Sequence, residues 1–168
     1  MAEPHLSPPL GSALISNCGQ YRYFLSRIWG DQDCLNVVTF VGLNPSKADA
    51  SFDDPTLRRC MNFAKSWGYS GLWMVNLFAF RATEPKEMMC ANDPIGPDNE
   101  KHLAEAILGA RLVVAAWGVG GGFKGRDQEV LERYGKGGRF SCLGLTKGGK
   151  PRHPLYLKKT SIPFTMVD

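Results

Sequence analysis

Short apolar runs recur along the chain and predict a series of buried strands. The runs at residues 35–41 (LNVVTFV) and 112–117 (LVVAAW) are nearly continuous, which is typical of strands that are covered on both faces of a sheet. The predicted strands are residues 21–29, 35–41, 72–78, 112–117 and 139–145.

Between these runs the apolar spacing changes to that of helices. Apolar side chains from Leu57 to Ala64 recur at three- and four-residue intervals, Asp54 is suited to cap the first turn, and Gly68 is suited to end the helix. Further helices are predicted at residues 98–108 and around Val130 and Leu131. The alternation predicts an α/β fold, a three-layer sandwich with a central, mostly parallel sheet.

Composition and length place this fold in one domain that spans residues 1–168. The chain is 43% hydrophobic and 21% charged, which suits a globular core rather than a disordered segment. We expect a loosely ordered start at residues 1–18 and a basic tail segment at residues 147–168. No apolar stretch reaches the roughly 18–20 residues that span a bilayer. Residues 1–10 lack a basic region typical of a secretory signal, so we expect a cytoplasmic monomer without a membrane partner.

Basic side chains are concentrated near the end of the chain. Ten Lys or Arg residues lie within residues 124–159, against three acidic ones, although the net charge of the whole chain is only +4. Such a segment suits binding of a polyanion such as nucleic acid, or it is simply a solvated basic surface. The charge alone leaves both interpretations open.

No metal or cofactor is expected from the recognisable motifs. The five cysteines are scattered and form no C-x-x-C pair, which favours reduced thiols over a metal site. Gly120, Gly122 and Gly125 match G-x-G-x-x-G after a strand, but the acidic residue that would hold a ribose about 20 residues later is absent. A tight turn is the favoured interpretation of this loop, with a phosphate cradle as the alternative.

Polar segments follow the predicted strands at residues 42–54, 76–83 and 118–126, and residues 147–156 can join them. Because ligands of such sheets lie beyond the carboxyl ends of the strands, these segments predict the site. Asn44 either positions a water or closes a local turn. Asn76 interrupts an apolar strand, so it either reads the edge of a base or is a hydrogen-bonded core amide. His153 could stabilise a developing oxyanion.

Four motifs in order resemble the mismatch-specific and thymine branch of the uracil-DNA glycosylase superfamily. They are GLNP at residues 42–45, LWMVNL at 72–77, LVVAAWG at 112–118 and HP at 153–154. The order and spacing agree over residues 37–156. The stretches NPSKADASFDDPT, VNLFAFRAT and PRHPLYL are also similar to a bacterial family of uncharacterised proteins. The sequence departs from the superfamily after Pro154, where Leu155 and Tyr156 replace Ser-Pro.

The resemblance implies a uracil-DNA glycosylase-like fold and an enzyme that hydrolyses the N-glycosidic bond of a damaged, mismatched or modified base, leaving an abasic site. Its partner would be double- or single-stranded DNA with a flipped base. His153 would donate to the departing base and Asn44 would orient the water, while Asp49, Asp53 or Asp54 takes its proton. Asn76 would bind the base edge. The aromatic side chains expected to stack on the base are Phe52, Phe78 and Phe80.

The resemblance and the basic tail also imply a set of DNA contacts. Leu155 or Tyr156 would fill the stack that the flipped base leaves. The polar and basic residues expected on the DNA are Ser46, Lys47, Arg81, Lys124, Arg126, Lys147, Lys150 and Arg152.

Two other functions remain open at the level of sequence. One is an enzyme that acts on free nucleosides or nucleotides, and the other is a non-catalytic reader of modified nucleic acid. Within the glycosylase interpretation, the small and polar residues at 47–53 leave room for a bulkier base such as those of some phage genomes, which would make the protein an antiviral defence enzyme.

Overall fold

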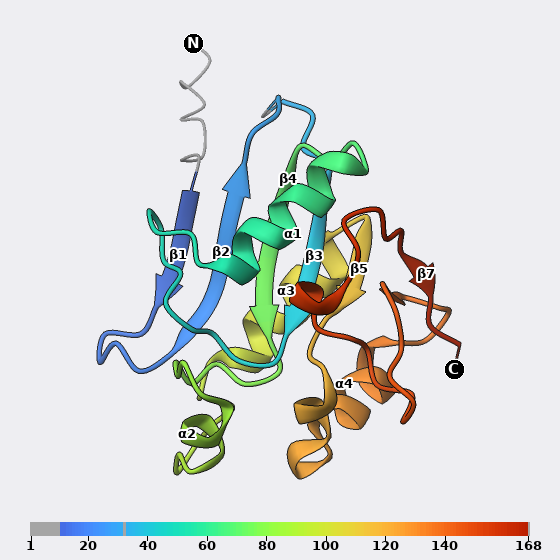
Figure 1. The fold of residues 1–168 in the computed structure, drawn as a ribbon. Helices are drawn as coiled ribbons and strands as arrows, with labels where there is room; N and C mark the ends of the chain where they lie inside the picture. Colours follow the sequence, from blue (N-terminus) through green and yellow to red (C-terminus); the bar gives the residue numbers. More distant parts are fainter. Residues whose placement is uncertain (1–10, 32, 168) are drawn as a thin grey trace.

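One mixed β-sheet organises residues 11–31 and 33–167, the part of the chain that the computed structural model describes (Figure 1). Its strand order is β1-β2-β4-β3-β5-β6-β7. The strands are β1 (Gly11–Ile15), β2 (Arg22–Ile28), β3 (Val37–Gly42), β4 (Gly71–Asn76), β5 (Leu112–Ala115), β6 (Phe140–Cys142) and β7 (Phe164–Thr165).

The prediction of a mostly parallel sheet holds only for its centre. The four adjacent strands β4, β3, β5 and β6 are parallel, whereas β1, β2 and β7 pair antiparallel to their neighbours. The outer strands need no crossover helix, because β1 and β2 form a hairpin and β7 returns beside β6. An apolar run in a sequence does not reveal the direction of the neighbouring strand, so the pattern could not distinguish these cases.

Helices cover both faces of the sheet and confirm the α/β class. α1 lies on one face, as Figure 1 shows, and packs Leu57 and Phe63 into a core with Val38, Phe40 and neighbours. α3 and α4 contribute to a second core on the other face. The helices are α1 (Pro55–Ser66), α2 (Pro85–Met89), α3 (Asn99–Gly109) and α4 (Arg126–Tyr134), with short 3-10 helices η1 (Val119–Gly125) and η2 (Pro154–Tyr156).

Strand β3 shows how the sequence builds the two cores. Val37 and Val41 face the core beneath α3, whereas Val38 and Phe40 face the core beneath α1. Thr39 is fully buried, and its hydroxyl donates to the Ala106 carbonyl of α3 at 2.8 Å. The strand is therefore covered on both sides, as its continuous apolar run predicts.

Local capping places α1 at the end of the 42–54 loop. The Asp54 carboxylate accepts a hydrogen bond from the Leu57 amide at 2.8 Å, and Pro55 begins the helix. Both features match the expectation from sequence. Beyond α1, Gly68 adopts a φ of +82°, a left-handed conformation that favours glycine.

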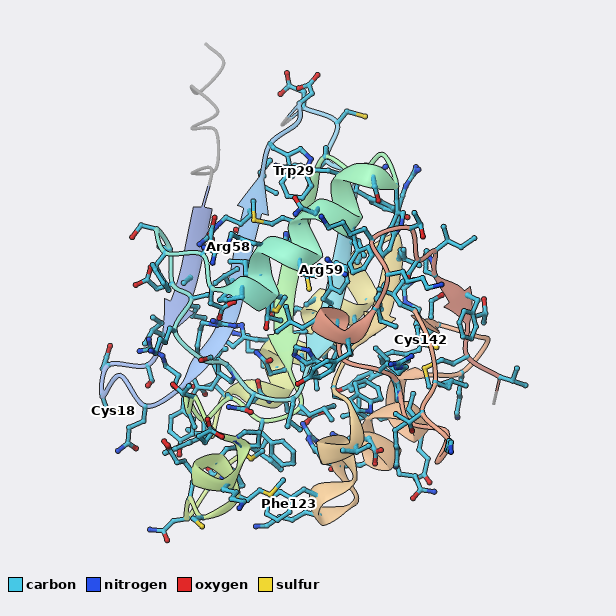
Figure 2. The ribbon with its side chains drawn as sticks, in the orientation of Figure 1. Cys18, Trp29, Arg58, Arg59, Phe123 and Cys142 are labelled. Atoms are coloured by element: carbon cyan, nitrogen blue, oxygen red, sulfur yellow. The ribbon has the colours of Figure 1, made fainter. Side chains whose placement is uncertain are left out.

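The ends of the chain differ from the expectation. Residues 1–10 lie outside the described residues, but residues 11–15 form β1 instead of a loose segment. The basic tail segment contains η2 and β7, and Arg59 of α1 donates to the Leu157 carbonyl, which ties this tail to the helix (Figure 2). The strand predicted at 139–145 is shortened to β6. None of the helices in the described residues is long and apolar enough to cross a membrane.

Candidate active site

A cavity of about 600 Å³ lies at the carboxyl ends of the central parallel strands. The segments that follow β3, β4 and β5 line it, together with the start of α1 and the 153–156 segment. The lining side chains that carry nitrogen or oxygen atoms belong to Arg22, Asn44, Ser46, Asp54, Thr56, Asn76, Thr83, Trp117, His153 and Tyr156. Asn44, Asn76 and His153, which lie far apart in the sequence, therefore meet around one cavity.

Asn76, the last residue of β4, is a buried amide with an unpartnered donor. It is 3% exposed, and its Nδ2 atom has no hydrogen-bond partner in the described part of the chain. A buried amide that forms no bond inside the protein costs free energy. Asn76 also lines the cavity, so this unpartnered amide lies where a ligand of the cavity would bind. The second buried amide of this region, Asn99, donates through Nδ2 to the carbonyls of Asn76 and Leu77, whereas its Oδ1 has no partner in the described residues.

Asn44 follows β3 and is held in one orientation by the backbone. Its Nδ2 group donates to the Ala82 carbonyl at 2.9 Å and to the Pro45 carbonyl at 3.2 Å. Both amide hydrogens thus point to the protein, which leaves the side-chain oxygen as the acceptor for a polar group in the cavity. This arrangement suits the positioning of a water.

His153, in the basic tail segment at residues 147–168, also lines the cavity. Its Nδ1 atom accepts a hydrogen bond from the Leu155 amide at 3.3 Å, so a neutral ring carries its hydrogen on Nε2. Burial lowers the pKa of His153 below its ordinary value, and the negative charge of Asp54 partly opposes this shift. A neutral imidazole that can donate through Nε2 is the form that results near neutral pH.

The carboxylate of the cavity is Asp54, which corrects the expectation for Asp49 and Asp53. Asp49 accepts from the amides of Ser51 and Phe52 at 2.9 and 2.8 Å, which lowers its pKa and makes it a poor base. Asp53 pairs with Arg27 at 2.8 Å. Neither residue lines the cavity, whereas Asp54, the N-cap of α1, does.

The three phenylalanines expected to stack on a base lie elsewhere. Phe78 is fully buried and packs on Phe123, whose ring centroid is 5.6 Å away, so it belongs to the core. Figure 2 places Phe123 at the end of the molecule that η1 forms. Phe80 packs edge-on against Tyr21. Phe52 is exposed, and none of the three lines the cavity. The aromatic side chains that do line it are Phe40, Trp117 and Tyr156.

Two of the expected DNA contacts are instead parts of ion pairs. Arg126 is 1% exposed and pairs with Glu100 at 2.8 Å and Glu129 at 2.9 Å, while its Nε donates to the Leu77 carbonyl. Lys150 pairs with Asp127. Glu100 lies on α3, outside residues 124–159, so the charge of that segment alone overstated how many of its cations are free.

The other residues expected to contact DNA lie in three kinds of place: at the cavity, half-buried outside it, or exposed on the surface. Leu155 and Tyr156 are exposed at 44% and 75% and line the cavity with half-buried Ser46. Arg81 is half-buried outside it and donates to the Gly19 carbonyl at 3.2 Å. The exposed basic residues are Lys47, Lys124, Lys147 and Arg152.

Arg22 is a cavity residue that the sequence reasoning missed. It begins β2, is 3% exposed, and donates through Nη1 to the Ala48 carbonyl at 2.7 Å. Among the residues that the structure describes, its Nε atom and the indole nitrogen of Trp117 join Asn76 Nδ2 as buried cavity donors without a partner. An arginine inside the apolar run YRYFLSRIW was the available signal, because a buried charge requires a partner.

Fold and site together define an α/β domain with a polar cavity at the carboxyl ends of its parallel strands, the usual place for a ligand in this class. Residues 22–155 match the family described as "Protein of unknown function (DUF1643)", and the chain belongs to this family. No curated protein and no solved structure matches the chain. The matched region contains every residue of the cavity except Tyr156. The described residues contain no cluster of three His, Cys, Asp or Glu side chains that could hold a metal.

Proposed function

We propose that this protein is a DNA glycosylase that hydrolyses the N-glycosidic bond of a damaged, mismatched or modified base flipped into the cavity, within a uracil-DNA glycosylase-like fold. The observation that carries the proposal is the unpartnered amide of Asn76, which is buried at the cavity beside Asn44, Asp54 and His153. A nucleobase edge supplies the carbonyl oxygen that such a donor needs.

The departing base requires stabilisation of negative charge. When the C1′–N bond breaks, its electron pair remains on the base and is delocalised onto the exocyclic carbonyl oxygens. The Nε2–H group of neutral His153 is suited to donate to such an oxygen, and the Nδ2 group of Asn76 to another acceptor on the base edge. Donors already oriented in a buried site stabilise the charge without reorganising.

The sugar requires a water and a nearby negative charge. The side-chain oxygen of Asn44 would accept a hydrogen bond from the water and direct its oxygen toward C1′. As the water oxygen bonds to C1′, its proton passes to the Asp54 carboxylate. The same carboxylate, before it is protonated, stabilises the positive charge that develops on the sugar. The products are the free base and an abasic site.

The rim of the cavity provides contacts for DNA. Leu155 and Tyr156 project exposed apolar surface beside His153, which suits filling the gap that a flipped base leaves. Exposed Arg152 and Lys47 lie next to cavity residues in the sequence and would contact phosphates.

The test is base release from defined duplexes. Duplexes that carry uracil, mismatched thymine, 5-hydroxymethylcytosine or its glucosylated form are incubated with the protein and then treated with hot alkali, which breaks the strand at abasic sites. We expect breaks with at least one substrate, and their loss in Asn76→Ala and His153→Gln. His102→Gln is the matched control, because His102 stacks on Tyr23 and does not line the cavity.

Other outcomes would overturn the proposal in distinguishable ways. Tight binding to one duplex without strand breaks would favour a reader of modified nucleic acid. Release of base from mononucleotides but from no duplex would favour an enzyme on free nucleotides. Strand breaks that persist in both cavity variants would place the chemistry elsewhere or in a contaminant.

A further inference from the structure

Arg22 stands out among the buried arginines of this protein because no carboxylate partners it. Arg27, on the same strand, pairs with Asp53 at 2.8 Å, and Arg126 pairs with Glu100 and Glu129. Within residues 11–31 and 33–167, no carboxylate oxygen lies within 4.0 Å of the Arg22 guanidinium. Its Nη1 donates to the Ala48 carbonyl, but its Nε has no partner.

Arg22 is buried, lines the cavity and stays charged near neutral pH. Burial lowers the pKa of Arg22 to about 10, so the group remains a cation near neutral pH. Asp54 and Asp49 contribute negative potential at this site, and Arg81 and Arg27 contribute positive potential. Arginines are seldom fully buried unless they are paired. A partner that the chain does not supply is therefore expected from a ligand.

The cavity has space for such a partner beyond a base. Its volume of about 600 Å³ is several times that of a pyrimidine ring. Phe40, Cys60 and Met74 line the cavity together with Arg22 and give its wall apolar surface. A ligand that fills the cavity thus extends past the base that Asn76 contacts.

We infer that Arg22 forms an anion subsite, which binds a carboxylate or phosphate carried by the same molecule whose base occupies the cavity. The inference deepens the proposed function and rests on it for the identity of the base. Arginine suits this role because its planar donors match the oxygens of a carboxylate or phosphate. The anion has two chemical sources: an acidic substituent on the base, or the phosphate of a nucleotide that enters the cavity whole.

The experiment compares charged and uncharged ligands of the intact protein by titration calorimetry. Uridine 5′-monophosphate against uridine tests the phosphate source, and uracil-5-acetic acid against thymine tests the substituent source. Each pair is measured with the wild type, Arg22→Gln and Arg22→Lys. Arg27→Gln is the matched control, because Arg27 is also a buried arginine of β2 but does not line the cavity. Thermal unfolding of each variant checks that it is folded.

We expect the charged member of one pair to bind about ten- to a hundredfold more tightly than its neutral partner, the range that a charge-assisted hydrogen bond supplies. Arg22→Gln abolishes this preference, Arg22→Lys retains part of it, and Arg27→Gln retains all of it. Equal affinities within both pairs, a preference that survives Arg22→Gln, or no binding by any of the four probes would overturn the inference. Base release from duplexes is measured separately, so a failed anion subsite and a failed glycosylase assignment give different results.

Discussion

The side-chain oxygen of Asn76 occupies the space that a side chain at Gly42 would need. A Cβ atom at residue 42 would lie 2.7 Å from Asn76 Oδ1, closer than such contacts occur in proteins. The two residues are register partners at the carboxyl ends of β3 and β4. The absence of a side chain at Gly42 therefore lets the amide of Asn76 take its position at the cavity.

Gly42→Ala is expected to displace this amide and to lower the rate of base release by about a hundredfold, because a shift of about 1 Å in a positioned group has an effect of that size. The backbone at Gly42 has no positive φ, so the fold tolerates alanine. Gly148→Ala is the control, since a Cβ there meets only the Thr146 hydroxyl at 3.8 Å. Single-turnover rates and melting temperatures measure both effects. An unchanged rate of base release in Gly42→Ala would show that the position of the Asn76 amide does not matter for the reaction.

The two buried amides Asn76 and Asn99 are expected to respond oppositely to truncation. Asn99→Ala removes the amide that donates to the Asn76 carbonyl and one of the two donors to the Leu77 carbonyl, which also accepts from Arg126, and lowers the free energy of unfolding by about 1–3 kcal/mol. Asn76→Ala removes an amide whose nitrogen is already unpartnered, so its effect on stability is smaller, but base release falls by about 10²–10³-fold. Urea unfolding measures the stability of the two variants, and strand cleavage measures their base release. A larger loss of stability in Asn76→Ala than in Asn99→Ala would show that Asn76 has a structural role.

The pH dependence follows from the lowered pKa of His153. Its folded-state pKa lies below the ordinary value of 6.5, so the folded protein binds fewer protons than the unfolded chain between these two values. The stability contribution is complete above pH 6.5 and is lost as pH falls through the folded pKa. Activity falls over the same acidic range, because the charged ring no longer accepts from the Leu155 amide.

The titration of His153 can be followed by nuclear magnetic resonance of its ring protons, and activity by base release between pH 4 and 8. His153→Gln should remove the stability change assigned to this residue. A ring that titrates above pH 6.5 would contradict the expected direction.

Asp54 is expected to be the carboxylate that matters for the chemistry. Asp54→Asn preserves the cap of α1, since asparagine caps helices as well as aspartate, but lowers the rate by roughly 10²–10⁴-fold if Asp54 accepts the proton. Asp53→Asn breaks the pair with Arg27 and lowers the melting temperature, with the rate unchanged. If the rate of Asp53→Asn were lower than that of Asp54→Asn, the proton acceptor would be Asp53 and not Asp54.

Substitution of Arg126 is expected to lower stability, whereas substitution of Arg152 is expected to weaken DNA binding without a change in stability. Arg126→Met breaks a buried ion-pair network and lowers the free energy of unfolding by roughly 3–5 kcal/mol. Arg152→Ala leaves stability unchanged and reduces the slope of log affinity against log salt by about one, the effect of one lost phosphate contact. Fluorescence anisotropy with labelled duplex over a salt series measures the slope. An unchanged slope in Arg152→Ala would remove Arg152 from the DNA surface.

The sequence by itself determined the features that depend on near neighbours. Apolar spacing identified β3, β4, β5 and three of the helices, and the Asp54-Pro55 pair located the start of α1, because periodicity and capping act within a few residues. The rule that ligands bind beyond the carboxyl ends of parallel strands also grouped Asn44 and Asn76.

Only the tertiary structure decided which side chains are available. Phe78 and Arg126 lie in segments that follow strands, as candidate residues should. Phe78, however, is buried and packs on Phe123 of η1, and Arg126 is buried and paired with Glu100 of α3 and Glu129 of its own helix. Arg22 faces the cavity although its strand reads as part of the core. Burial and pairing depend on segments distant in the chain, whose approach to one another no local pattern encodes. The same holds for the antiparallel outer strands, whose direction is set by the partner and not by their own residues.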